Sequence, residues 1–203
     1  MNKLAQIGRC LFHPRELRMT LSGLGVRLAG DHRLGGLSAE ETAGLVGWIR
    51  EARPAVFVEI GTLFGFTAKA VAATGVRVVA VDNFSWNPFG LSSADHEAFA
   101  RRILEGTSVE LVNADAADFL ARLSERLGVP ADRCWIFLDG DHRYEAVKRE
   151  LELCRQAGVR HFSGHDWDNS GFGVTRAVRE VLGEPDAVVG SCWRNCHNFT
   201  NMI

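Results

Sequence analysis

The sequence contains no long hydrophobic segment. None of its stretches approaches the roughly 18 consecutive apolar residues that a membrane-spanning helix requires. The N-terminus also lacks the uninterrupted apolar core of a signal peptide, because polar and charged residues recur there, namely Arg9, His13, Arg15 and Glu16. We therefore expect a cytoplasmic protein without a membrane partner.

Neither sign of charge is in marked excess. The formal net charge is −2 and the sequence pI is about 6.4. Lysine and arginine are mixed with aspartate and glutamate, and no run of like charge is long enough to follow a phosphate backbone. This distribution argues against a nucleic-acid substrate.

Cysteine is sparse and odd in number. The five cysteines are Cys10, Cys134, Cys154, Cys192 and Cys196. Cys134 and Cys154 fall in apolar stretches, where a thiol behaves as a small hydrophobe, so a disulfide framework is not expected. Cys192 and Cys196 with His197 could form half of a zinc site, but no second pair with suitable spacing completes it.

The length of 203 residues suits one domain with one substantial core. Residues 1–36 contain six glycines and no strong periodicity, which indicates an irregular N-terminal extension and a candidate cover for an active site. Residues 37–203 are expected to form the domain. Whether the chain forms a homo-oligomer is left open by the sequence.

Short apolar runs alternate with helical stretches through most of the chain, which predicts parallel strands joined by crossover helices. The first helix is expected to begin at Ser38, with Glu41 completing a capping box, and to end at Pro54. We predict strands over residues 55–60, 77–81, 108–112, 135–138 and 161–163. We predict the intervening helices at about residues 67–74, 93–104, 116–127, 144–157 and 174–182.

The end of the chain has a different pattern. Residues 187–193 and 196–202 are compatible with β-strands, and only Arg194 and Asn195 separate them. This spacing suits a two-residue hairpin turn. We therefore predict an antiparallel strand at the end of the sheet.

The most distinctive local motif is the segment from Val58 to Gly65, in which a strand enters a glycine turn and then a helix. Glycine lets a backbone approach a ligand closely, and the helix N-terminus offers unpaired amides. The G-x-x-x-G spacing of Gly61 and Gly65 departs from the G-x-G-x-x-G pattern of dinucleotide sites, so a nicotinamide cofactor is disfavoured.

Acidic residues follow the next two predicted strands. Asp82 comes 23 positions after Glu59, close to the step at which Rossmann-type sites place an acid on ribose hydroxyls. Asp115 lies between Ala114 and Ala116, where small neighbours leave room for an adenine ring. Either acid could instead only cap a helix, but ligands of open α/β sheets bind beyond the carboxyl ends of the strands, where both acids are expected.

The order of these motifs resembles the class I S-adenosylmethionine (SAM)-dependent methyltransferases. The motifs are Glu-Ile-Gly-Thr-x-x-Gly, Val-Asp-Asn, Asn-Ala-Asp-Ala, Phe-Leu-Asp-Gly-Asp-His-x-Tyr and Gly-His-Asp, and they span roughly residues 38–183. More narrowly, the chain resembles the branch of metal-dependent small-molecule O-methyltransferases and cephalosporin hydroxylase-like proteins. The resemblance implies a Rossmann-like α/β fold with a mostly parallel seven-stranded sheet, a C-terminal antiparallel hairpin strand and helices on both faces.

The resemblance also implies the residues of the site. Those implied for SAM binding are Glu59, Gly61, Thr62, Gly65, Asp82, Asn83, Asp115, Ala116 and Asp139. Those implied for a divalent metal are Asp139, His165 and Asp166. The family usually has an oxygen ligand where this chain has His165, and imidazole suits Mn, Fe or Zn more than Mg, so the identity of the metal stays open.

Proton transfer would fall to the same cluster. His142 and His165 are both candidates for the general base, because imidazole titrates near neutrality, and Asp139 completes the catalytic set. The cluster could alternatively be an Asp–His hydrogen-bond network that only fixes two loops. The aromatic side chains Trp86, Trp167 and Phe172 are candidates for the wall of a substrate pocket.

We therefore expect a SAM-dependent methyltransferase that methylates an oxygen of a small-molecule substrate with help from a divalent metal. Two alternatives remain. One is a metal-dependent hydroxylase-like enzyme on the same fold, and the other is a non-catalytic SAM-binding partner protein.

Overall fold

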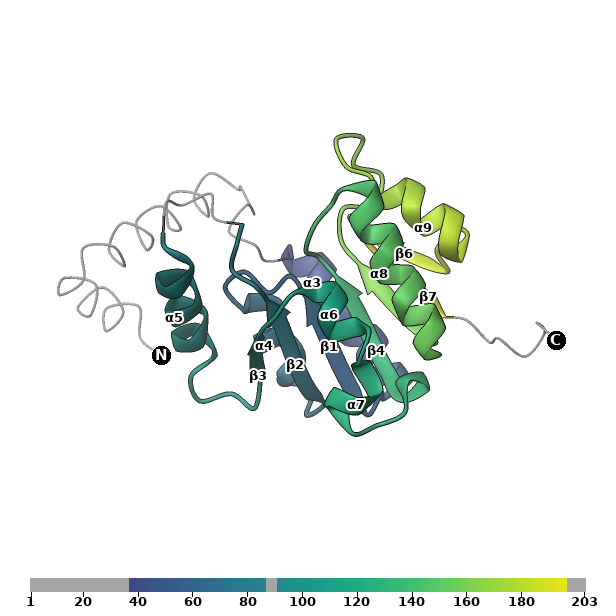
Figure 1. The fold of residues 1–203 in the computed structure, drawn as a ribbon. Coiled ribbons are helices and arrows are strands. Elements are labelled where there is room, and N and C mark those ends of the chain that lie inside the picture. The colour runs from purple at the N-terminus through teal and green to yellow at the C-terminus, as the bar shows by residue number, and fades with distance from the viewer. Residues whose placement is uncertain (1–36, 87–90, 197–203) are drawn as a thin grey trace.

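Seven strands of the described chain, residues 37–86 and 91–196, pair into one sheet in the computed structural model (Figure 1). The strands are β1 (Val56–Ile60), β2 (Arg77–Asp82), β3 (Glu110–Asn113), β4 (Cys134–Leu138), β5 (His161–Gly164), β6 (Ala187–Val189) and β7 (Cys192–Cys196). Their order is β3-β2-β1-β4-β5-β7-β6, and β7 runs antiparallel to both of its neighbours. The other pairings are parallel. The predicted α/β class and its mostly parallel sheet are confirmed.

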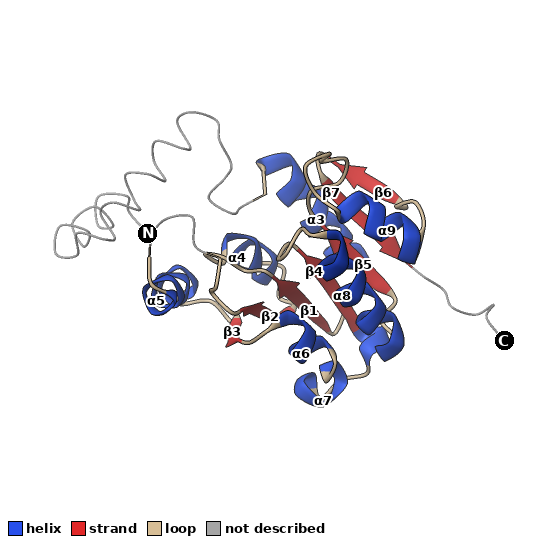
Figure 2. Ribbon diagram, turned by 45° about the horizontal axis from the view of Figure 1, so that its top comes forward, coloured by secondary structure: helices blue, strands red, loops and turns tan. Residues whose placement is uncertain are grey.

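Helices cover both faces of the sheet (Figure 2). They are α3 (Ala39–Ala52), α4 (Phe66–Ala72), α5 (Ser93–Leu104), α6 (Ala116–Leu120), α7 (Leu123–Leu127), the 3-10 turn η1 (Ala131–Arg133), α8 (Tyr144–Ala157) and α9 (Val174–Leu182). The residues of α3, α4 and α5 pack on one face, and those of α6 to α9 pack on the other. The predicted bounds of α5, α8 and α9 are confirmed.

The central strands divide the core into two layers by their alternating side chains. Phe57, Trp135 and Phe137 face α3 and α4, whereas Val58 and Ile136 face α6 to α9. Every residue of β1 and β4 is buried, which explains why β4 is a continuous apolar run and why β1 is apolar except at Glu59. The carboxyl ends of these rigid strands provide a fixed edge on which loops can present polar side chains.

The first described helix begins as the sequence predicts. The Glu41 N–H donates to Ser38 Oγ, and the Ser38 N–H donates to Glu41 Oε2, which completes the capping box. The helix ends at Ala52, one residue before Arg53 takes a left-handed conformation and two before Pro54.

The predicted turn of the C-terminal hairpin is wrong. The chain turns at Gly190 and Ser191, and Arg194 and Asn195 lie inside β7. Gly190 has a φ of 59°, which glycine adopts at little cost. The Asn195 side chain is buried and donates to the carbonyl oxygens of Leu182 and Glu184, so its polarity serves packing rather than a turn. The predicted strand over residues 196–202 lies outside the described residues beyond Cys196.

Other predicted elements differ from the structure in their bounds, and the helix expected at about residues 67–74 is α4, Phe66–Ala72. The single helix expected over residues 116–127 is two short helices, because the backbone of Arg122 leaves the helical region at a φ of −124°. The third strand begins at Glu110 rather than at residue 108 and continues to Asn113. The difference at β3 lies at the edge of the sheet, where none of the residues of this strand is fully buried.

The proposed role of residues 1–36 as a cover for the active site falls outside the described residues. Among the helices that are described, none combines the length and the apolar composition needed to cross a membrane.

Candidate active site

The turn after β1 brings the ends of β1 and β4 into contact. Gly61 has a φ of 85°, and its N–H donates to the Val81 carbonyl oxygen at 2.9 Å. A Cβ at Gly61 would lie 2.3 Å from the Asp139 carbonyl oxygen and 2.4 Å from the Gly140 Cα. Only glycine fits here, because the loop after β4 lies against this position. The sequence does not reveal that contact. The role of Gly61 in SAM binding stays a prediction.

Asp82 ties this turn to the end of β2. One carboxylate oxygen accepts from the Leu63 N–H and the other accepts from the Phe84 N–H, both at 2.7 Å. Leu63 and Phe84 have positive φ values of 50° and 55°, so the carboxylate stabilises two backbone conformations that are unfavourable for these residues. Each oxygen keeps a further lone pair that a ligand hydroxyl can use.

Glu59 lies beneath the same turn. Its carboxyl group is buried and accepts a 2.7 Å hydrogen bond from Thr62 Oγ1. Burial raises the pKa of Glu59 from 4.5 to about 8, and the nearby charges of Asp139 and Asp82 add to the rise. Glu59 is therefore largely protonated at neutral pH in the folded protein.

The raised pKa of Glu59 predicts a pH-dependent stability. Because the folded protein binds this proton more tightly than the unfolded chain, stability falls as the pH rises from about 4.5 to about 8. Glu59→Gln should remove this contribution, since the amide stays neutral and its oxygen can still accept from Thr62. In thermal melts, the Tm of the variant minus the Tm of wild type should increase by at least about 3 °C when the pH is raised from 5 to 8.

A control is provided by Glu145→Gln, because Glu145 is exposed at the start of α8. Its Tm should follow that of wild type across this range. Parallel curves for Glu59→Gln and wild type would contradict the assigned protonation of Glu59.

Three further residues predicted to contact SAM lie at the ends of β2 and β3. Asp115 caps α6, and its Oδ1 accepts from the N–H groups of Ala117 and Asp118. Ala116 is the first residue of that helix. Asn83 is exposed, and its Oδ1 accepts from the Ser85 N–H. The roles of these residues in SAM binding stay predictions.

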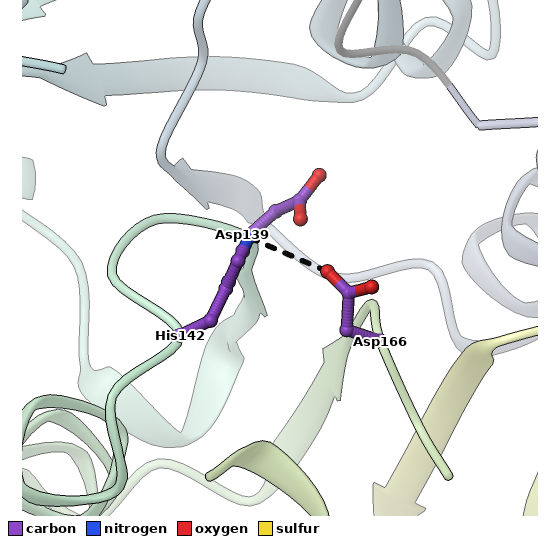
Figure 3. A group of neighbouring side chains, drawn as sticks. All are labelled: Asp139, His142 and Asp166. Carbon is purple, nitrogen blue, oxygen red and sulfur yellow. Dashed lines mark ion pairs between the residues drawn. The ribbon is translucent and has the colours of Figure 1, made fainter. Parts of the chain in front are cut away.

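A cluster of two carboxylates and an imidazole lies at the ends of β4 and β5. Asp139 follows β4, His142 lies in the next loop, and Asp166 follows β5 (Figure 3). Each residue offers one ligand atom within 4.8 Å of the others, and His142 Nε2 is 3.3 Å from Asp166 Oδ2. Nitrogen and carboxylate oxygen form a suitable donor set for Mn, Fe or Zn.

His165, the residue implied as a metal ligand by the family resemblance, lies beside this cluster. Its Nδ1 is 3.7 Å from Asp139 Oδ1 and 3.6 Å from Asp166 Oδ2. Its Nε2 is 3.3 Å from Glu41 Oε1. The geometry thus adds His142 to Asp139 and Asp166, while ligation by His165 stays a prediction.

The two histidines differ in charge. Burial lowers the pKa of His142, so its ring is neutral near pH 7. Burial also disfavours charge on His165, but the close contact with Asp166 and the charges of Asp139 and Glu41 outweigh it and raise the pKa to about 9. Burial raises the pKa of Asp139 to about 7. His142 can therefore accept a proton or a metal ion, whereas His165 carries its proton near pH 7.

The loop after β5 is held in place by hydrogen bonds with β7 and with the turn that precedes β7. Asp166 and Asp168 have φ values of 60° and 58°, which aspartate tolerates better than most residues. The Trp167 N–H donates to the Ser191 carbonyl oxygen at 2.9 Å, and Trp193 Nε1 donates to the His165 carbonyl oxygen at 3.2 Å. These contacts fix the backbone on both sides of Asp166.

The aromatic residues expected at a substrate pocket have different surroundings. Phe172 is 43% exposed and its ring centroid lies 4.6 Å from that of His142, so it can contact a ligand near the cluster. It borders an open pocket of about 610 Å³ that Asp168 and Arg176 also line. Trp86 is exposed, whereas Trp167 is buried in the core and does not line this pocket.

The sheet order, the glycine turn and the acid at the end of β2 together define a class I SAM-dependent methyltransferase. The chain belongs to the methyltransferase domain family, whose model matches residues 58–160. The resemblance noted in the sequence is confirmed, and the protein is a methyltransferase. No curated protein matches the sequence.

Solved structures share the fold. A methyltransferase from Geobacter sulfurreducens is 18% identical with a TM-score of 0.59, and the match covers 90% of this chain and 89% of that one. An O-methyltransferase from Bacillus cereus, solved in complex with S-adenosylhomocysteine (SAH), is 21% identical with a TM-score of 0.56, covering 78% and 74%.

A SAM-dependent methyltransferase from Agrobacterium tumefaciens is 18% identical with a TM-score of 0.50, and the match covers 70% of this chain. The chain spans only 50% of that protein. At these identities the likeness establishes the fold, and the substrate has to be argued from the site.

Proposed function

We propose that this chain transfers the methyl group of SAM to an oxygen atom of a small molecule, with a divalent metal held by Asp139, His142 and Asp166. The observation that carries the proposal is the convergence of these three side chains within 4.8 Å, directly beside the glycine turn that contacts the Asp139 backbone. The similar Bacillus cereus protein is an O-methyltransferase solved with SAH, which supports the oxygen acceptor.

The proposed reaction needs an electrophile, an oxygen nucleophile and their alignment. SAM supplies the methyl group, and a bound metal would lower the pKa of the acceptor hydroxyl and orient it. The chain contributes positioning: Asp82 orders the turn beside the donor, and the backbone contacts of Trp167 and Trp193 fix the loop that carries Asp166. The exposed ring of Phe172 lies where it can border the acceptor.

Binding of the methyl donor tests this proposal without knowledge of the acceptor. Isothermal titration calorimetry should detect binding of both SAM and SAH to the purified protein. Asp82→Asn should weaken SAH binding at least about tenfold, because an amide accepts through one oxygen only and leaves a backbone N–H or a ribose hydroxyl without an acceptor.

Asp132→Asn is the matched control, since Asp132 lies in η1 at the opposite end of β4 from Asp139. It should bind SAH as wild type does. Failure of both SAM and SAH to bind the wild-type protein would overturn the proposed function. Release of SAH in the presence of a panel of hydroxylated small molecules then identifies the acceptor.

A further inference from the structure

Glu41 is tied to the proposed site although it lies in the first turn of α3, outside the residues that the family model matches. Its side chain is only 9% exposed. One carboxylate oxygen accepts from the Ser38 N–H at 2.8 Å. The other accepts from the Ser191 N–H at 2.8 Å and lies 3.3 Å from His165 Nε2. A residue that the sequence marks only as a helix cap therefore connects three distant segments.

The surrounding structure is shaped around this carboxylate. A Cβ at Gly190 would lie 2.6 Å from Glu41 Oε1, so the turn between β6 and β7 accommodates the carboxylate through glycine. The next residue, Ser191, donates its N–H to Glu41 and accepts through its carbonyl oxygen from the Trp167 N–H. The same turn thus holds both Glu41 and the backbone that follows Asp166.

The contact also determines how the His165 ring lies. With Nε2 facing Glu41, Nδ1 is the nitrogen that faces Asp139 and Asp166, at 3.7 Å and 3.6 Å. The imidazole ring therefore bridges α3 and the two carboxylates of the candidate metal site. If the Glu41 carboxylate were absent, Nε2 would lose this partner and the ring could rotate about its side-chain bonds.

We propose that Glu41 is a positioning residue for the methyl-transfer site, which holds Nε2 of His165 and so directs Nδ1 at Asp139 and Asp166. This role rests on the proposed function for its effect on turnover, but the ring contact itself does not depend on that function. Partners that orient the groups around a metal site typically change activity by about 10-fold to 100-fold when they are removed.

The comparison of Glu41→Ala with Ser38→Ala tests the role. Ser38→Ala removes the hydroxyl that caps the same helix but leaves the Glu41 contact with His165. We expect Glu41→Ala to lower kcat about tenfold or more with the KM for SAM within about twofold of wild type. Ser38→Ala should lower the Tm but leave kcat within about twofold. Equal losses of kcat in both variants would show that Glu41 acts only by capping the helix and would overturn the proposal.

The conservative variant Glu41→Gln keeps an oxygen that can accept from Ser191 and from Nε2. It should recover kcat to within about threefold of wild type. Long-range proton–nitrogen NMR of the ligand-free protein, with ¹⁵N-labelled histidine, reads the ring directly. The Nε2 proton of His165 should give a protected signal in wild type and Glu41→Gln, whereas in Glu41→Ala exchange with water should broaden that signal beyond detection.

The two proposals fail in different ways. A wild-type protein that neither binds SAM nor releases SAH would overturn the proposed function while the NMR signal stayed intact. Retention of the Nε2 proton signal in Glu41→Ala, or a kcat of Glu41→Gln as low as that of Glu41→Ala, would overturn the positioning role.

Discussion

Replacing Asp166 with asparagine is expected to lower kcat at least about a hundredfold while leaving the affinity for SAH within about threefold of wild type. The change removes one of the two carboxylates of the candidate metal site. A metal that activates a hydroxyl contributes several kcal/mol, and about 1.4 kcal/mol corresponds to a factor of ten in rate. Asparagine tolerates the left-handed φ of 60° at this position, so the backbone should keep its conformation.

Calorimetry with Mn²⁺ measures the metal site directly, and the affinity for Mn²⁺ should fall together with kcat. Asp168→Asn is a close control, because Asp168 lies in the same loop with a φ of 58° and is not part of the cluster. It should bind Mn²⁺ as wild type does. If turnover is insensitive to chelators and is unchanged in Asp166→Asn, the cluster has only a structural role.

A second large effect is expected from Gly61→Ala, which should destabilise the fold by at least about 3 kcal/mol. The new Cβ would lie 2.3 Å from the Asp139 carbonyl oxygen, and this neighbour is backbone that cannot rotate away. The positive φ of 85° adds a conformational cost. Thermal or chemical denaturation measures the loss, which corresponds to a fall in Tm of roughly 6–12 °C.

Gly75→Ala separates the two contributions to this loss. Gly75 has a φ of 86°, but a Cβ there meets no atom within 4 Å. Its cost should be about 1 kcal/mol, the conformational part alone. If Gly75→Ala and Gly61→Ala lost equal stability, the close contact between the new Cβ and the Asp139 backbone would contribute nothing to the destabilisation.

The sequence predicts the sheet well where burial alone decides the pattern. The centre of the sheet is such a case, because β1 and β4 are buried throughout and all of their residues except Glu59 are apolar. It fails at the C-terminal hairpin, since Arg194 and Asn195 resemble a turn in composition. The side chain of Asn195 finds its partners at Leu182 and Glu184, and no local pattern reveals these contacts.

The site is predictable to a similar extent. Acids at strand ends are visible in the sequence because parallel strands end at one edge of the sheet, and Asp82 and Asp139 do lie there. The family resemblance implies His165 as the metal ligand, and the sequence leaves the general base open between His142 and His165. How each imidazole lies beside the carboxylates depends on loop geometry, which no local pattern reveals. Glu41 lies 124 positions from His165, and its capping motif gives no sign of that contact.

The two hydrogen bonds that Asp82 accepts from Leu63 and Phe84 also bear on how quickly a ligand can bind. They hold the turns after β1 and β2, where we propose that the methyl donor binds, in one arrangement through contacts within the chain itself. The entropy of ordering these loops is therefore lost during folding, and little of it is left to oppose association. On the proposed function, recognition of SAM then resembles docking to a preformed surface more than induced fit, with its rate governed by diffusion and access.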